Sequence, residues 1–150
     1  MLARLTELLY VEVLRRHMQR LPAGQTGWLA GVKDRFVGRA LSILHAQPAY
    51  NWTVDELARK VGLSRSAFAQ RFSDLLGQPP MQYLARWRLI VAAQELSYSS
   101  KAIAAIAEEV GYESESAFHR AFRREFGQPP AAWRKRHSQV TGTEALLASQ

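Results

Sequence analysis

The sequence predicts an all-α protein in which two similar helical units are joined by a long helix. Glycine and proline divide the chain into helical blocks, no segment alternates polar and apolar residues with period two, and one pattern occurs twice. The chain has 150 residues, 47% of them hydrophobic, and no cysteine. Such a chain can form an apolar core without disulfides, and it holds no thiolate nucleophile or thiolate metal site.

The N-terminal block, residues 2–21, is predicted to form an extra helix that ends at Pro22, Gly24 and Gly27. An apolar stripe follows helical spacing in this block: Leu2, Leu5, Leu8, Leu9 and Val13. We therefore expect three segments, namely residues 1–27 as N-terminal helix and linker, residues 28–138 as the folded domain, and residues 139–150 as a flexible tail.

The first unit combines helix-start and helix-stop signals. A block from Asp34 to Ala46 precedes Thr53–Glu56, whose Thr-x-x-Glu pattern is typical of a capping box at a helix start. After a short helix closed by Gly62, Ser64 is expected to cap another helix with the buried stripe Phe68, Phe72, Leu75 and Leu76. A linker helix over about 79–96 follows, broken by the serine-rich stretch 97–100.

The second unit repeats the first. The glycines that end the short helices, Gly62 and Gly111, are 49 residues apart, and the spacing is 50 from Phe68 and Phe118 onward. The second turn therefore contains one extra residue. Each copy is a short helix, a turn opening on glycine and a second amphipathic helix, which is the helix-turn-helix pattern. We expect these motifs at about 34–77 and 100–127, with a final helix at 129–137.

The spacing alone is also compatible with two helical hairpins packed in a bundle. The outward faces of the second helices favour a DNA-binding motif over this alternative. In a helix-turn-helix the second helix enters the major groove, where short or donor-rich side chains reach base edges and phosphates. The net charge is +7, and sixteen of the twenty basic residues are arginine, which suits bidentate contacts with guanine and phosphate.

Residues 106–134 resemble the DNA-binding domain of the AraC/XylS family of bacterial transcription regulators. The matching pattern is I-A-x-x-V-G-Y-x-S-x-x-x-F-x-R-A-F-R-R-x-F-G-x-P-P-x-x-W-R. The resemblance extends over residues 33–137 and implies two helix-turn-helix subdomains that bind adjacent major grooves of a double-stranded operator and contact RNA polymerase. Arg4, Glu7 and Glu12 interrupt the apolar N-terminal stretch, which argues against a signal peptide and predicts a cytoplasmic protein. We also expect no cofactor and no membrane association.

The resemblance assigns DNA contacts position by position. The base-contact candidates are Ser66, Ala69, Gln70, Glu115, Ser116, His119 and Arg120. The phosphate candidates are Arg65, Arg71, Arg123 and Arg124. The family usually has arginine at the place of Gln70. Glu115 is open to two interpretations, an acceptor for a cytosine amino group or a solvated acid favoured by the helix dipole.

Other classes of function are weighed against this one. The four histidines show no paired metal spacing, and no phosphate loop or nucleophile elbow is present, so we predict no enzyme and no metal site. A helical protein-interaction module, or a truncated regulator with little DNA binding of its own, is the alternative. Residues 2–20 are expected either to pack on the first unit or to pair two copies in a homodimer.

Overall fold

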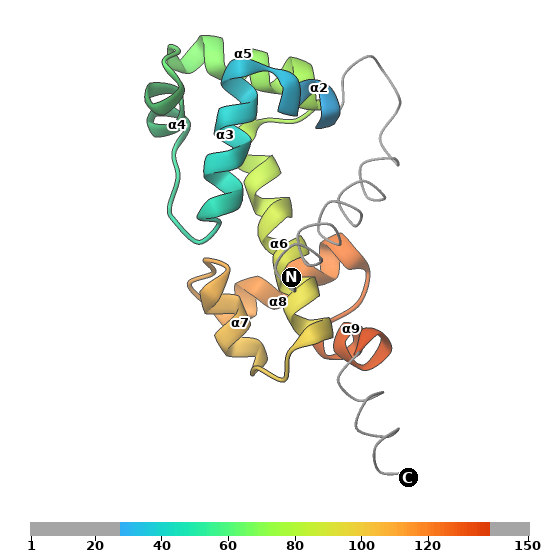
Figure 1. The fold of residues 1–150 in the computed structure, drawn as a ribbon. Helices are drawn as coiled ribbons and strands as arrows, with labels where there is room; N and C mark the ends of the chain where they lie inside the picture. Colours follow the sequence, from blue (N-terminus) through green and yellow to red (C-terminus); the bar gives the residue numbers. More distant parts are fainter. Residues whose placement is uncertain (1–27, 139–150) are drawn as a thin grey trace. The chain divides into compact units, whose positions relative to one another are not determined.

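The computed structural model describes residues 28–138, which form helices and their connections (Figure 1). No strand occurs in these residues. The helices are α2 (Trp28–Lys33), α3 (Arg35–Ala46), α4 (Val54–Val61), α5 (Arg65–Leu76), α6 (Pro80–Tyr98), α7 (Ile103–Glu109), α8 (Glu115–Phe126) and α9 (Pro130–His137). The prediction of an all-α fold with two helix-turn-helix motifs and a long connecting helix is confirmed. The predicted helix over 2–21 and the tail 139–150 lie outside the described residues.

The chain divides into two compact units, which we call unit 1 (Met1–Trp87) and unit 2 (Arg88–Gln150). The helix-turn-helix of unit 1 is α4–α5 and that of unit 2 is α7–α8. Helix α6 begins in unit 1 and ends in unit 2, so each unit uses part of it as a core element.

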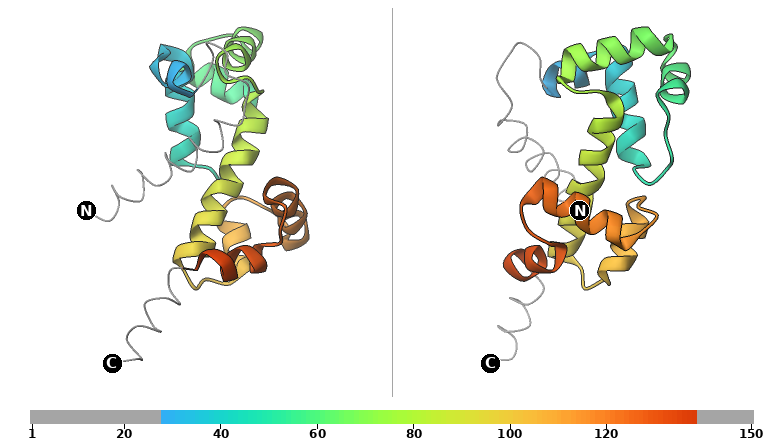
Figure 2. Two further views of the ribbon diagram at one scale, coloured as in Figure 1. Left: turned by 90° about the vertical axis from the view of Figure 1, so that its right-hand side faces the viewer. Right: turned by 180° about the vertical axis from the view of Figure 1, so that it is seen from behind.

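Unit 1 contains a helix that the sequence did not predict. Helix α2 has only six residues, which is too short to show helical periodicity, and it packs against α3 and α5 (Figure 2). Its contact with α3 is close. A Cβ placed on Gly38 of α3 would lie 2.5 Å from the carbonyl oxygen of Val32, so only glycine fits there. The fully buried side chains beneath these helices include Leu44, Leu57, Phe68 and Phe72.

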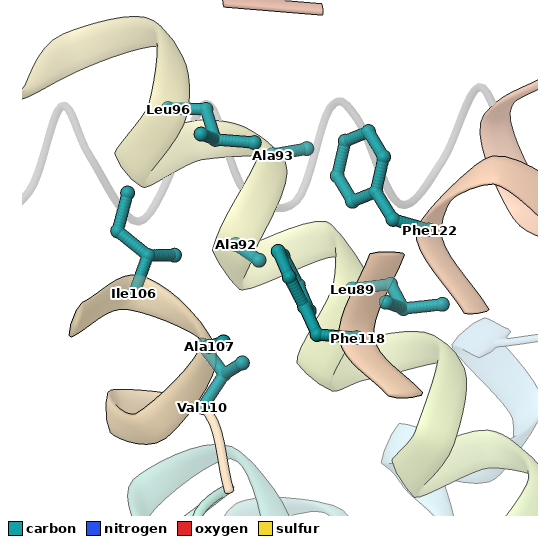
Figure 3. Close-up of a cluster of buried hydrophobic side chains, with 9 residues drawn as sticks. All are labelled: Leu89, Ala92, Ala93, Leu96, Ile106, Ala107, Val110, Phe118 and Phe122. Carbon is teal, nitrogen blue, oxygen red and sulfur yellow. The ribbon is translucent and has the colours of Figure 1, made fainter. Parts of the chain in front are cut away.

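The core of unit 2 is apolar and is built from three helices (Figure 3). Phe118 and Phe122 of α8 point towards the second half of α6 and towards α7, and neither ring is exposed to solvent. The buried residues of this cluster are Leu89, Ala92, Ala93, Leu96, Ile106, Ala107, Val110, Phe118 and Phe122. They hold α8 by one face and leave its opposite face to solvent.

Helix α6 ends at Tyr98, two residues later than the sequence predicted. The serines expected to break it are accommodated, because Ser97 Oγ donates to the Ala93 carbonyl (2.9 Å) and Ser99 Oγ to that of Glu95 (2.7 Å). Helix α9 closes the same end. Arg134 donates from Nε to the Leu96 carbonyl (3.1 Å) and from Nη2 to that of Ser99 (3.3 Å), so a cation meets the negative end of the α6 dipole.

Candidate nucleic-acid interface

Helix α5 is held in unit 1 by caps at both ends and by a buried aromatic face. Ser64 Oγ accepts from the Ala67 amide (3.2 Å), and Gly77 ends the helix with a left-handed φ of 75°. Because Phe68 and Phe72 are fully buried, the residues between them face outward. Of the predicted contact residues, Arg65, Ser66, Gln70 and Arg71 are exposed and Ala69 is half-buried.

Two of these outward side chains already bond within unit 1. Gln70 Nε2 donates to Asp74 Oδ1 at 2.8 Å, one helical turn further along α5. Arg65 Nη1 lies 3.4 Å from Asp55 Oδ2 at the start of α4. Both members of that ion pair are more than half exposed, so the pair contributes little stability and Arg65 is free to exchange its partner for a phosphate.

Arg71, predicted to contact phosphate, is committed to a structural bond. Its Nε and Nη2 donate to Asp34 Oδ2 at 2.9 and 2.6 Å, and its guanidinium lies 5.2 Å from the centroid of the Phe36 ring. Asp34 is also the N-cap of α3, where it accepts from two backbone amides. The hydrogen bonds from Arg71 lower the pKa of Asp34, so this carboxylate stays charged and holds Arg71 against the protein.

Helix α8 is built on the same plan in unit 2. Ser114 Oγ accepts from the Ala117 amide (3.1 Å), and Gly127 ends the helix with φ 75°. The predicted contact residues lie on the face opposite the buried phenylalanines. Those that are exposed are Glu115, Ser116, Arg120, Arg123 and Arg124, while His119 is partly covered with 38% of its side chain accessible.

Glu115 and His119 form a pair on one face of α8. His119 Nε2 lies 3.3 Å from Glu115 Oε1, the i,i+4 geometry of neighbouring helix turns. Glu115 also stands in the first turn of α8, where a negative charge is stabilised by the amide dipoles. The structure therefore gives this acid a partner inside the protein, and the arginines beyond it form the most basic stretch of the helix.

Sequence reasoning missed two acids that shape this interface, Asp74 and Asp34. Asp74 could have been found, because a glutamine and an aspartate four residues apart on a helix are positioned to bond. Asp34 could not, since 37 residues separate it from Arg71 and only the packing of α3 on α5 brings them together. Both acids line an open hollow beside α5, together with Gln70 and Arg71.

The remainder of the described chain offers few alternatives to this interface. Within residues 28–138 no three acids or histidines group closely enough to hold a metal ion. In the same part of the chain no helix is both long and apolar enough to cross a membrane. Three tryptophans take part in packing: Trp52 and Trp87 are buried, and Trp133 Nε1 donates to the Ala93 carbonyl (3.1 Å).

Comparison with known proteins agrees with this geometry. Residues 57–136 match the family model of a helix-turn-helix domain. A Streptomyces lividans protein described as an AraC-like transcription regulator is 47% identical over 131 residues, which are 87% of this chain and 43% of that protein. This chain therefore spans less than half the length of that relative.

Two solved structures have the same fold. An AraC-type DNA-binding domain protein from Chromobacterium violaceum aligns with a TM-score of 0.66 and 30% identity, covering 70% of this chain and 94% of that one. The DNA-binding domain of AdpA, solved with a target DNA, aligns with a TM-score of 0.64 and 29% identity over 69% and 92% of the two chains. Together with the matched family model, these similarities show that this chain belongs to the AraC family of helix-turn-helix transcription regulators.

Proposed function

We propose that residues 28–138 are the sequence-specific DNA-binding domain of a transcription regulator, and that α5 and α8 each enter the major groove of a double-stranded operator. The observation that carries this proposal is the outward face of α8, where Arg120, Arg123 and Arg124 are exposed opposite a fully buried phenylalanine face. Exposed arginines on a rigid helix suit contacts to guanine edges and phosphates.

The linker helix supports binding in two adjacent grooves. Helix α6 has 19 residues and is therefore about 28 Å long. Successive major grooves on one face of B-DNA lie about 34 Å apart. A helix of this length, with each recognition helix adding some offset, suits one chain that reads two neighbouring grooves, as dimers of simpler helix-turn-helix proteins do.

The roles of individual residues follow from their placement. We propose that Ser66, Gln70, Ser116 and Arg120 read base edges, with Ala69, Glu115 and His119 beside them. Arg65, Arg123 and Arg124 are proposed phosphate contacts. Arg71 acts instead through Asp34, as a brace between α5 and α3. No catalytic group, cofactor or metal is part of this proposal, in keeping with the regulatory role named for the relatives.

Partners beyond DNA are proposed by family resemblance. RNA polymerase is the expected protein partner at a promoter, and the bacterial cytoplasm, where the chromosome lies, is the expected location. A homodimer through residues 2–20 remains a proposal about a segment outside the described residues, and the activity of a longer regulator would add to what this domain does.

The deciding experiment is selection of the chain on a randomised DNA duplex library at physiological salt. Enrichment of two short elements about one helical turn apart is the expected result. Weak binding without enrichment, falling steeply with salt, would show only phosphate attraction and would contradict sequence-specific reading. No detectable binding to duplex DNA, even at low salt, would favour the protein-interaction alternative.

A further inference from the structure

Across four matching positions the outward faces of the two recognition helices differ in net charge, whereas at the helix starts the order is reversed, with Arg65 in α5 and Glu115 in α8. With the spacing of 50 residues, Ser66, Gln70, Ser73 and Asp74 of α5 correspond to Ser116, Arg120, Arg123 and Arg124 of α8. The α8 set carries three arginines, and the α5 set carries one aspartate and no cation. An acid on the outward face of a helix that approaches phosphates costs affinity, so Asp74 calls for an explanation other than attraction to DNA.

Asp74 has a defined contact, and that contact is a predicted base-reading residue. Its Oδ1 accepts the hydrogen bond from Gln70 Nε2 at 2.8 Å, and both side chains are exposed. Arg71 lines the same hollow, but its donors are directed at Asp34 Oδ2. Asp74 therefore interacts with the reading side chain of α5 rather than with this neighbouring cation.

This hydrogen bond fixes which way the amide of Gln70 faces. A carboxylate accepts only, so the NH2 end of the amide must turn to Asp74, and its oxygen is left free. Gln70 then offers Oε1 as an acceptor and one remaining N–H as a donor. Adenine presents the complementary pair in the major groove, an N6 amino donor beside the N7 acceptor.

Guanine presents the opposite pattern to this pair. Its major-groove edge has two acceptors, N7 and O6, so the remaining N–H of Gln70 can donate to only one of them and the amide oxygen must face the other. An unpaired acceptor facing other acceptors is costly when water is excluded. An amide held by Asp74 should therefore reject guanine as well as accept adenine.

We propose that Asp74 is a positioning residue for DNA recognition: by accepting from Gln70 Nε2 it sets unit 1 to read an A·T pair, while Arg120 at the matching place in unit 2 reads a G·C pair. The inference rests on the proposed function, because it assumes that α5 enters the major groove. Both units then read a base, and unit 2 supplies most of the exposed arginines that are proposed to face the DNA.

The test separates the hydrogen bond of Asp74 from its charge. Randomised duplex selection and binding titrations are run on the 150-residue chain and on Q70A, D74A, D74N, R120A and the double variant Q70A/D74A, with thermal unfolding to confirm that each variant is folded. Asn keeps a side-chain carbonyl that can accept from Gln70 but loses the charge. E108Q, which neutralises an exposed acid of α7, is the matched control for net charge.

The expected pattern is specific. The wild-type chain should prefer adenine over guanine at one position of the unit 1 element by roughly 5- to 150-fold. Q70A and D74A should both lose that preference, and the double variant should lose no more than either. Because asparagine also carries N–H donors, D74N no longer fixes the amide of Gln70 and should keep only part of the preference. It should bind all sequences several-fold more tightly, an increase that E108Q should not match.

Other outcomes overturn the inference or the function beneath it. If D74A keeps the wild-type preference, or if the position lost in Q70A favours guanine, Asp74 does not position Gln70. If the selected duplexes contain only one sequence element, the one whose enrichment is lost in R120A, then the DNA-binding function stands and this inference fails. If the wild-type chain enriches no sequence, the proposed function itself fails.

Discussion

Helices α5 and α8 have the same length, the same serine N-cap and the same left-handed glycine at the end, yet their exposed faces differ in charge. The buried phenylalanines match at both positions, Phe68 with Phe118 and Phe72 with Phe122. The outward residues match only at Ser66 and Ser116. The comparison shows that the buried phenylalanine positions of α5 and α8, which the fold requires, are the same in both units. The exposed positions are not constrained by packing and can differ in how they bind DNA.

The helices that support them differ in the same manner. Helix α4 ends in Arg59 and Lys60, where cations are favoured by the helix dipole, while α7 has Glu108 and Glu109 at the matching places. Lys101 compensates in part, with its ammonium 3.2 Å from Glu109. The short helix that precedes the recognition helix thus has a basic end in unit 1 and an acidic end in unit 2.

The largest expected effect tests whether the two cores are equivalent. Replacing Phe118 or Phe68 with alanine removes a fully buried ring and should lower the free energy of unfolding by about 3–5 kcal/mol in either case. Hydrogen exchange measured by mass spectrometry should show the lost protection in α7–α9 for F118A and in α2–α5 for F68A. Equal loss in both units from one variant would show that the units do not fold separately.

Acid should destabilise unit 1 in particular, because it contains a buried histidine, His45, whose pKa is lowered by burial. His45 lies against Trp87 (ring centroids 4.2 Å) and shares a 2.6 Å hydrogen bond with Tyr83, and burial lowers the pKa of His45 from 6.5 to about 4. The unfolded chain therefore takes up this proton first as the pH falls. Stability that is complete above pH 6.5 should be lost progressively down to pH 4, by about 3 kcal/mol.

The measurement for His45 is denaturant unfolding at several pH values, with exchange protection assigned to each unit. Unit 1 should weaken over this window, and H45F should remove most of that slope. A slope unchanged in H45F would mean that other groups titrate. The apolar cluster of unit 2 contains no titratable side chain, so its protection should depend less on pH between 6.5 and 4.

Base reading by α8 should depend on one guanidinium. Arg120→Ala should cost about 1–3 kcal/mol of binding free energy on the preferred duplex and relax the preference at a single base pair, because a bidentate contact to guanine is lost. Arg120→Lys, which keeps the charge but not the fork of donors, should recover affinity more than preference. Unchanged affinity and preference in R120A would show that α8 is not the reading helix.

The smallest effect distinguishes a phosphate contact from a structural arginine. Arg124→Ala should weaken binding uniformly across sequences and reduce the slope of log affinity against log salt by about 1. Arg71→Ala should leave that slope nearly unchanged and lower stability instead, since its guanidinium bonds to Asp34. Salt titrations of both variants check the comparison, and a matching fall in slope for R71A would return Arg71 to the DNA contacts.

Much of this architecture could be predicted because local signals agree with one another. Ser64 and Ser114 cap their helices as expected, and Gly62, Gly77 and Gly127 end them in the left-handed region. Helix α2 could not be predicted, because tertiary packing rather than periodicity stabilises six residues. The serine-rich stretch predicts an end to α6 two residues before the observed one, because serine disfavours helix interiors although its hydroxyl can bond to the preceding turn.

The candidate interface was predictable in position but not in its internal bonds. Amphipathic spacing places Gln70 and Arg120 outward without any knowledge of the packing. The commitment of Arg71 to Asp34 depends on how α3 meets α5, which spacing along the chain does not encode. The sequence therefore predicts which side chains are exposed better than it predicts which of them are already bonded within the protein.

The capping of α6 by Arg134 has a consequence for the order in which the units are completed during synthesis. The residues of unit 1 end at Trp87, within α6, so its core can form while the rest of the chain is still being synthesised. Unit 2 is complete only after Trp133 and Arg134 have been synthesised, because these residues donate to carbonyls of α6 that lie 40 and 38 residues earlier in the chain. On the ribosome, the unit proposed to read an A·T pair would therefore be completed before the unit proposed to read a G·C pair.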